Sequence, residues 1–355
     1  MKVAGAATVA QLAEFDEAHF DEILDVRSPS EFAEDHIPGA INCPVLDDEE
    51  RARVGTIYKQ VSPFDAKKIG AAIVSRNIAR HLEQRFLERP RDWRPLVYCW
   101  RGGKRSGAMT HVLNQIGWHA RQLEGGYKAY RRAVLEALAI QPQKFQWRVV
   151  CGLTGSGKSR LLQALRKLSV QVLDLEELAC HRGSVLGNMP GTPQPPQKYF
   201  ESMVFAELNK FDPAKPVYVE AESKKIGDLR VPQAMIDAMW NGACIRLEAD
   251  QASRVQLLKE EYAHFLADPI SLHTKLDCLT GLYGNEVIAH WKALASQKQW
   301  GNLVEELLVK HYDPAYTRST LKHYARYECG LILRAVNLSE QAMLHLAREA
   351  IDWKA

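Results

Sequence analysis

The pattern of apolar and polar residues divides the chain into short apolar runs that alternate with longer amphipathic stretches. In the first part of the chain, the apolar runs predict strands within 19–28, 40–45, 94–100 and 119–126. The amphipathic stretches predict helices at 28–36, 65–87, 106–117 and 127–138. The first of these helices opens with Ser-x-x-Glu, which is typical of a capping box. Strands that alternate with helices favour a parallel-rich α/β sheet.

The same alternation restarts after QPQK at 141–144, which we interpret as a linker. Further strands are predicted within 145–151, 170–178, 215–223 and 243–250. The Gly- and Pro-rich stretch 180–200 predicts a long loop that is either functional or disordered. From about Gln251 to Ala355 the pattern is mostly helical, without strand alternation. We therefore expect two α/β domains, at 1–140 and 145–250, followed by a helical region at 251–355.

The composition is that of a folded protein without a membrane span. The chain has 355 residues, 46% hydrophobic and 25% charged, a length that suits two or three domains. No apolar run approaches the ~20 residues that cross a bilayer, and the N-terminus is too acidic to resemble a signal peptide. The 7 cysteines are scattered, which argues against a disulfide framework or a structural zinc site. We expect a cytoplasmic protein with mostly buried, reduced thiols.

The net charge of +3 hides a strong asymmetry along the chain. Residues 1–50 carry 2 basic and 13 acidic side chains, whereas residues 51–148 carry 20 basic and 6 acidic ones. A basic block of this size suits a nucleic-acid backbone, although its cations can instead pair with the acidic segment. The candidate nucleic-acid contacts are Lys67, Lys68, Arg76, Arg80, Arg131 and Arg132.

Cys99 differs from the other cysteines because it ends a predicted strand and begins a Gly-rich turn, CWRGGKRS, that leads into a helix. Inward-pointing amides and the positive end of a helix favour a thiolate at such a turn and hold an oxyanion beside it. We therefore predict that Cys99 is a nucleophile and that Arg105 is its catalytic partner. The oxyanion loop between them consists of Trp100, Arg101, Gly102, Gly103 and Lys104.

Three segments of the first domain resemble rhodanese domains. They are DVRSPSEFAEDHIPGAINCP at 25–44, the CWRGGKRS loop and LEGGYKAYRR at 123–132. In that family the loop cysteine accepts a chalcogen atom as a persulfide-type intermediate. Phosphatases, including some on the same scaffold, also use the C-x5-R spacing found between Cys99 and Arg105. The loop alone therefore leaves both chalcogen transfer and phosphate-ester hydrolysis open.

The segment GLTGSGKS at 152–159 matches the phosphate-binding motif G-x-x-x-x-G-K-[ST] between a predicted strand and a predicted helix. Its amides cradle phosphate oxygens, Lys158 neutralises them, and the Ser159 hydroxyl reaches a Mg²⁺ ion if one is bound. The motif predicts a di- or triphosphate ligand and does not by itself indicate ATP hydrolysis. The phosphate-binding residues are Gly152, Thr154, Gly155, Ser156, Gly157, Lys158 and Ser159.

Three acidic residues follow or end predicted strands of the second domain, namely Asp174, Glu220 and Glu222. Each is a candidate for the carboxylate on the Mg²⁺ side of the phosphate site. Each is also consistent with an ordinary solvated acid at a strand end. Arg254 opens the helix after the last predicted strand and either reaches a phosphate or lies at the surface.

A rhodanese-like unit joined to a P-loop unit resembles the tRNA 2-selenouridine synthase family, and the resemblance covers essentially the whole chain. Further similar stretches are RARVGTIYKQVSPFDAKKIGA at 51–71, VLDLEELACHRGSVLG at 172–187, VYVEAESKKIG at 217–227 and SRVQLLKEEY at 253–262. The resemblance implies a rhodanese-like parallel-sheet domain, then a P-loop NTPase-like α/β domain with a helical C-terminal region.

The resemblance also implies a function. Members of this family replace the sulfur of 2-thiouridine at the tRNA wobble position with selenium from selenophosphate. The thiouridine is first S-alkylated by geranyl diphosphate, which makes the sulfur a leaving group. Selenophosphate then suits the Cys99 loop, geranyl diphosphate suits 152–159, and tRNA suits the basic block, with Trp100 or Tyr127 either stacking on a base or simply packing. The implied partners are tRNA and an enzyme that supplies selenophosphate, without a tightly bound cofactor.

Two other functions remain open from the sequence. One is an ATP-dependent tRNA sulfurtransferase that forms a persulfide on Cys99 and binds ATP in the P-loop. The other is a nucleotide-gated binding protein whose cysteine loop is phosphatase-like or inert. A requirement for ATP and Mg²⁺ indicates the first, and loss of activity in a Cys99→Ala variant that still binds tRNA argues against the second.

Overall fold

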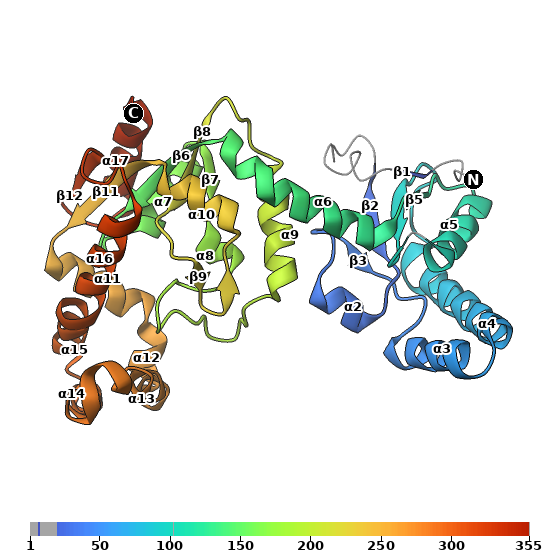
Figure 1. The fold of residues 1–355 in the computed structure, drawn as a ribbon, viewed down its shortest axis with the longest axis horizontal. Helices are drawn as coiled ribbons and strands as arrows, with labels where there is room; N and C mark the ends of the chain where they lie inside the picture. The colour runs from blue at the N-terminus through green and yellow to red at the C-terminus, as the bar shows by residue number, and fades with distance from the viewer. Residues whose placement is uncertain (1–5, 8–19, 102, 355) are drawn as a thin grey trace. The chain divides into compact units, whose positions relative to one another are not determined.

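The computed structural model describes residues 6–7, 20–101 and 103–354 and divides into two compact α/β units, each built on a five-stranded sheet (Figure 1). The first unit contains the described residues up to Ala137 together with Pro196–Asn209. The second contains Leu138–Pro195 and the chain from Lys210 onward. The predicted α/β class is confirmed. The sequence interpretation of the first twenty residues concerns positions that lie mostly outside the described residues.

The sheet of the first unit has the order β1-β5-β4-β2-β3, and every neighbouring pair is parallel. Its strands are β1 Ala6–Ala7, β2 Glu22–Asp25, β3 Ile41–Asn42, β4 Pro95–Tyr98 and β5 Arg121–Leu123. Its helices are α2 Pro29–Glu34, α3 Asp48–Gln60, α4 Pro63–His81 with the continuing turn η1 Leu82–Phe86, α5 Lys104–Ile116, α6 Gly126–Ile140 and α9 Gln197–Leu208. The central strand β4 is fully buried, and its packing fixes the position of Cys99, which directly follows it.

Local capping residues explain where the first helices begin. Ser28 and Glu31 form the predicted capping box at the start of α2. Asp47 and Glu50 form a second box at the start of α3, a helix that is not among the predicted ones. Ser62 caps α4, which lies beside α3 (Figure 1). The two helices form a hairpin on one side of the first unit.

A buried ion pair lies at the base of the Cys99 loop. The Arg27 guanidinium donates to the Asp25 carboxylate over 2.6 Å, and both side chains are almost fully buried. The guanidinium also lies 4.0 Å from the centre of the Tyr127 ring, whose hydroxyl donates to Asp35 over 2.7 Å. Tyr127 is therefore a packing residue of the core. Of the two roles considered for it, packing and base stacking, packing is the correct one.

The sheet of the second unit has the order β12-β11-β6-β8-β7 and is also parallel throughout. Its strands are β6 Gln146–Cys151, β7 Gln171–Leu173, β8 Pro216–Glu220, β11 Ala243–Ala249 and β12 Leu331–Ala335, with a separate hairpin of β9 Lys225–Ile226 and β10 Leu229–Arg230. Its helices and turns are η2 Gln141–Lys144, α7 Lys158–Lys167, α8 Leu175–Leu178, α10 Gln233–Trp240, α11 Gln251–Glu261, α12 Ala263–Ala267, α13 Pro269–Asp277, α14 Thr280–Ser296, α15 Trp300–Leu307, η3 Leu308–Tyr312, α16 Asp313–His323 and α17 Glu340–Asp352.

The C-terminal region is mostly helical, as predicted, but it contains one strand that the sequence pattern does not show, β12. This strand pairs with β11 in parallel register from Ile245↔Leu331 to Ala249↔Ala335, and α17 packs against α7. β12 has only five residues, and an apolar run this short does not show a strand period. The chain from α12 to α15 instead forms a separate apolar cluster around the fully buried Trp291.

The loop predicted within 180–200 ends earlier than expected. An isolated bridge joins His181 to Asn188, and α9 begins at Gln197. α9 belongs to the first unit, where Phe205 packs at 6.2 Å from Tyr130 and Lys198 pairs with Glu34. The chain therefore returns to the first unit in the middle of the sequence of the second.

Two further expectations concern the environment of the protein. Within the described ranges, we find no helix with the length and apolarity that crossing a bilayer requires. All seven cysteines are free thiols, of which Cys278 and Cys329 are exposed.

The buried ion pair generates a stability prediction. Asp25→Asn leaves the Arg27 charge buried without its partner, so we expect a loss of about 3–5 kcal/mol in the free energy of unfolding of the first unit. Asp21→Asn is the control, because the Asp21–Arg94 pair is about one-third exposed and the expected loss is under ~1 kcal/mol. Urea unfolding followed by circular dichroism measures both, and equal losses would contradict the account.

Candidate active sites

The sulfur of Cys99 is held by donors from its own loop and from α5. Cys99 directly follows β4 and its side chain is only 3% exposed. The Gly103 amide donates to Sγ over 3.4 Å and the Ser106 hydroxyl donates over 3.1 Å. Gln122 on β5 donates to Ser106 Oγ over 2.8 Å and to the Gly103 carbonyl over 3.0 Å. Donors placed in this way stabilise negative charge on the sulfur.

The backbone of the loop is fixed by the start of α6. The Tyr127 amide donates to the Cys99 carbonyl over 2.9 Å, and the Lys128 amide donates to the Trp100 carbonyl over 3.0 Å. The N-terminus of α5 begins at Lys104, so its positive end faces the loop. The Arg101 and Lys104 side chains are exposed. Gly102 lies outside the described residues, and the oxyanion role of the loop stays a prediction.

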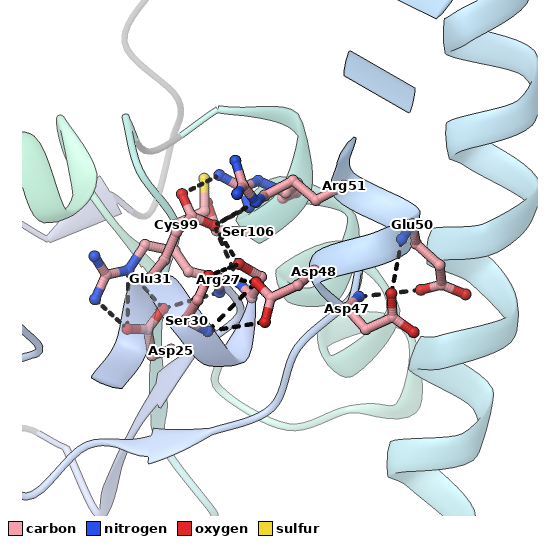
Figure 2. A network of polar contacts seen from close by, with 12 residues as sticks. Asp25, Arg27, Ser30, Glu31, Asp47, Asp48, Glu50, Arg51, Cys99 and Ser106 are labelled. Carbon is pink, nitrogen blue, oxygen red and sulfur yellow. Dashed lines mark hydrogen bonds and ion pairs between the residues drawn. The ribbon is translucent and has the colours of Figure 1, made fainter. Parts of the chain in front are cut away.

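The Arg105 guanidinium forms an ion pair with Glu31 on α2, at 2.9 Å. Figure 2 shows Arg51 of α3 reaching toward the same carboxylate, and its Nε lies 3.8 Å from Glu31 Oε2. Burial is the largest single influence and opposes ionisation of Glu31, but the hydrogen bond and charge of Arg105, the Ser28 amide and the Arg51 charge together outweigh it, so the pKa of Glu31 is lowered overall. Glu31 is therefore a carboxylate shared by two guanidinium groups, one of which belongs to the predicted catalytic pair.

The phosphate loop follows β6 and has the geometry that its motif predicts. Gly155 and Gly157 have φ of +77° and +89°, and a Cβ on Gly155 would lie 2.9 Å from the Leu258 side chain. Lys158 Nζ donates to the Gly152 carbonyl over 2.9 Å and lies 3.4 Å from the Glu220 carboxylate. These contacts fix the loop between β6 and α7, and phosphate binding by its amides stays a prediction.

Three carboxylates gather beside the phosphate loop. Their oxygens, from Glu176, Glu220 and Glu222, lie within 4.8 Å of one another. The Ser159 hydroxyl donates to Glu220 over 3.1 Å. Hard oxygen donors of this kind, next to a P-loop serine, fit Mg²⁺. Two of the three predicted acids, Glu220 and Glu222, are thus brought together, and Asp174 is not part of the cluster.

The electrostatics of the cluster reflect its burial. Burial, with Glu220 close by, raises the pKa of Glu222 to about 8. Burial also raises the pKa of Glu176 well above its usual range, with further contributions from Glu220 and Glu222. Asp174 instead caps α8 by accepting from the Glu177 amide over 2.9 Å. A divalent cation would relieve the repulsion among the three clustered carboxylates.

The C-terminal helices contribute directly to the phosphate site. Arg254 on α11 is buried, so the surface alternative is wrong, and it donates to the Thr154 carbonyl over 2.9 Å and to Asp313 over 3.1 Å. The Tyr316 hydroxyl on α16 accepts from the Gly152 amide over 2.9 Å. Tyr316 also lines a cleft of about 620 Å³ over the phosphate loop.

An apolar pocket adjoins this cleft. The cleft and the pocket share Thr154, Ser184, Leu258, Tyr262 and Tyr312. Most of the remaining lining comes from α12 to η3 and is apolar, including Phe265, Leu272, Trp300, Leu303 and Leu307, with Leu186 and Lys259 from outside these elements. The helical region therefore provides a hydrocarbon surface next to a phosphate cradle.

The predicted RNA-binding residues differ in their surroundings. Lys67, Lys68, Arg76 and Arg80 are exposed on α4, although Lys68 pairs with Asp65 and Arg76 pairs with Glu50. Arg131 is largely buried and pairs with Glu201 and Asp35, whereas Arg132 is exposed. Other cations of the basic block pair with acids of residues 1–50, as in Arg94–Asp21 and Arg89–Glu22. RNA binding by these residues stays a prediction.

Comparisons with known proteins match both units. Residues 6–133 match the rhodanese-like domain, and residues 145–283 match the tRNA 2-selenouridine synthase AAA domain. The chain is 37% identical over 252 residues to the tRNA 2-selenouridine synthase of Nitrosomonas europaea, covering 70% of this chain and 64% of that protein. It is 32% identical over 326 residues to the enzyme of that name in Marinobacter nauticus, covering 83% and 87%. For the Cupriavidus necator protein of that name the values are 33% over 334 residues, 86% and 89%. The chain belongs to the tRNA 2-selenouridine synthase family.

Several residues around the two sites of this family member are absent from the sequence predictions. Ser106 and Gln122 reach the Cys99 loop from a helix and a strand that are themselves predicted. Glu176 lies on a four-residue helix, and Tyr316 lies more than 150 positions beyond the loop that it contacts. Only Ser106 has a local signal, since it directly follows Arg105 at the helix N-terminus.

The contacts of the Cys99 sulfur predict its reactivity. Ser106→Ala removes one of the two hydrogen-bond donors that the described residues supply to Sγ, each worth about 1 kcal/mol, so alkylation of Cys99 by iodoacetamide slows by about 5- to 10-fold. Ser75→Ala, at an exposed serine of α4, leaves the rate unchanged. Mass spectrometry of the Cys99 peptide separates this thiol from the exposed Cys278 and Cys329. A wild-type rate in Ser106→Ala would remove the hydroxyl from the account.

The carboxylate cluster predicts a pH dependence of stability. The folded-state pKa of Glu222, about 8, lies above its unfolded value, so its ionisation costs stability as pH rises from about 4.5 toward 8. We expect Glu222→Gln to lose less stability than the wild type between pH 5 and pH 8, with divalent cations chelated. Thermal melts measure this, with the exposed Glu286→Gln as control. Parallel pH profiles for the wild type and Glu222→Gln would be incompatible with a raised pKa.

Proposed function

We propose that this protein replaces the sulfur of 2-thiouridine at the wobble position of tRNA with selenium from selenophosphate, through an S-geranyl intermediate made from geranyl diphosphate. Its relatives carry the name tRNA 2-selenouridine synthase, which supports tRNA as the substrate. The chain combines a thiol loop with a phosphate loop, and the proposed reaction needs one site for a selenium oxyanion and one for a diphosphate. We assign the reaction to the cytoplasm, where its thiols stay reduced.

The observation that carries the proposal is the apolar pocket beside the phosphate loop. A prenyl diphosphate is a charged diphosphate joined to a hydrocarbon, and the cleft and pocket offer these two environments side by side. The pocket has a volume of about 60 Å³, so it suits part of a hydrocarbon chain, and each CH₂ buried there contributes roughly 0.8 kcal/mol in favour of such a donor. A nucleotide would instead place a polar base or ribose at this surface, which the ATP-dependent alternative requires.

The proposed alkylation uses the residues of the second unit. The S–C bond forms as the C–O bond of geranyl diphosphate breaks, diphosphate leaves, and the nucleoside loses its N3 proton. Lys158 and the loop amides bind the charge that develops on the leaving diphosphate. A Mg²⁺ ion held by Ser159 and the adjacent carboxylates would add to this neutralisation.

The proposed selenium step belongs to the first unit. The C2–Se bond forms as the C2–S bond breaks, and the geranylthiol leaves. Water then cleaves the Se–P bond, so that the phosphoryl group leaves as inorganic phosphate and selenium stays on C2. Selenophosphate is a tetrahedral oxyanion, and the N-terminus of α5 with the loop amides suits such a group. Cys99 is the candidate nucleophile, with its sulfur held by the Gly103 amide and the Ser106 hydroxyl.

A direct test uses tRNA nucleosides from cells that lack this protein. We expect 2-selenouridine to be absent by mass spectrometry and to return when the gene is restored. Unchanged 2-selenouridine would overturn the proposed function.

The P-loop assignment predicts a bypass. Lys158→Ala removes a charge-assisted contact to phosphate and should lower geranylation of tRNA by at least about tenfold. S-geranyl-tRNA supplied ready-made should restore most of the selenation. Lys167→Ala, at the exposed end of the same helix, is the control. An equal defect with and without the ready-made intermediate would separate Lys158 from the geranyl donor.

The basic face of α4 predicts a change in salt dependence. Each phosphate that a cation neutralises contributes about −0.7 to −0.9 to the slope of log K against log salt. Lys67→Ala with Lys68→Ala should therefore flatten the slope for tRNA by about one to two units, with no effect on turnover at saturating tRNA. The control pair is Lys215→Ala with Lys354→Ala, two exposed lysines of the second unit. An unchanged slope would move the RNA surface away from α4.

A further inference from the structure

We propose that a groove beside Cys99 binds one unstacked nucleotide of the RNA, with its base on Trp100 and Tyr58 and its phosphate on Arg51. This inference rests on the proposed function and names the surface through which the RNA reaches the thiol. The residues of this groove that the argument uses are Glu31, Arg51, Tyr58, Lys59, Trp100 and Arg105. We call it the Trp100 groove.

The Trp100 groove lies between α2 and α3, next to the cysteine loop. Its volume is about 880 Å³, and Trp100, the residue after Cys99, forms part of its lining. That volume falls in the range of ~300–1,000 Å³ typical of small-ligand sites and exceeds what a tetrahedral oxyanion needs. The groove therefore has room for a larger group than the selenium donor.

The two walls of the groove are fixed relative to each other. The Ser30 amide on α2 donates to Asp48 on α3 over 3.2 Å (Figure 2). Asn77 on α4 donates to Glu50 of α3 over 2.7 Å and to the Val45 carbonyl over 3.1 Å. The groove is thus preorganised, which reduces the entropy lost when a flexible nucleotide binds.

Two aromatic side chains give the groove a stacking surface. Trp100 is half-buried, with its ring 5.2 Å from that of Tyr127, which is itself held by Arg27 and Asp35. Tyr58 on α3 is 54% exposed. Single-stranded RNA is recognised mainly by stacking unstacked bases on such rings.

The charges of the groove fit one phosphate. Glu31 has its closest cation in Arg105, whereas Arg51 is 45% exposed and lies farther from the carboxylate, at 3.8 Å. Lys59 adds a second exposed cation to the lining. The other acid of the lining, Glu34, pairs with Lys198. The cations of α3 therefore remain accessible to a backbone phosphate in a groove that Trp100 and Tyr58 also line.

The test uses an anticodon stem-loop RNA with 2-thiouridine at the wobble position. We expect Tyr58→Ala to weaken its binding by about 5- to 150-fold, the range for loss of one stacked base, and Tyr58→Phe to bind as the wild type does. Arg51→Ala should reduce the salt slope by about one unit. The control is Leu87→Ala, which removes an exposed side chain of the same unit outside the groove.

A second measurement keeps the groove and the proposed function separate. A photoreactive base at the wobble position should cross-link to peptides that contain Tyr58 or Trp100, whatever the chemistry that follows. Cross-links confined to other surfaces, or Tyr58→Ala binding within twofold of the wild type, would overturn the groove. If the wild type cross-links in the groove yet makes no 2-selenouridine, the groove stands and the proposed function fails. The groove assignment would also be overturned if the groove variants released a bound protein partner and left RNA binding unchanged.

Discussion

Each reactive loop follows a parallel strand that has a hydrogen-bonded neighbour on both sides. β4 lies between β5 and β2, and β6 lies between β11 and β8. Both strands are largely buried, so their C-terminal ends are fixed by packing and by the backbone ladder. The chain can then turn back into a helix only through a tight loop, whose amides and helix N-terminus face inward. The positions of Cys99 and of the phosphate cradle both depend on this constraint.

The two loops share this architecture, but the groups that contact them differ. At Cys99, neutral donors from Gly103 and Ser106 converge on a sulfur atom. At the phosphate loop, one cation, Lys158, meets buried carboxylates that lie close enough to repel one another. The first arrangement places hydrogen-bond donors around one sulfur atom, and in the second a divalent cation would relieve the repulsion among the carboxylates. The two units therefore suit the two separate steps of the proposed reaction.

Local sequence signals predict most strands of the two five-stranded sheets, the Cys99 loop and the phosphate loop, because each of these is encoded over a short stretch. The strand before Cys99 and the glycines of 152–159 carry their own patterns. Two elements, β12 and α9, could not be predicted from local sequence. β12 is defined by pairing with a strand about 85 positions earlier, and α9 is defined by its packing in the first unit. Tyr316 and Arg254 likewise acquire their contacts to the phosphate loop only through the tertiary fold. Asp174 was a reasonable candidate from its strand end, but the backbone of α8 takes its carboxylate as a cap.

The central claim is that the thiol and the phosphate loop act in different steps. The most direct measurement is nucleoside mass spectrometry of 2-thiouridine tRNA incubated with a Cys99→Ala variant, geranyl diphosphate and selenophosphate. The account predicts that S-geranyl-2-thiouridine accumulates and that 2-selenouridine does not form. Formation of 2-selenouridine at the wild-type rate, or loss of the geranyl product together with it, would contradict the division of labour between the two units.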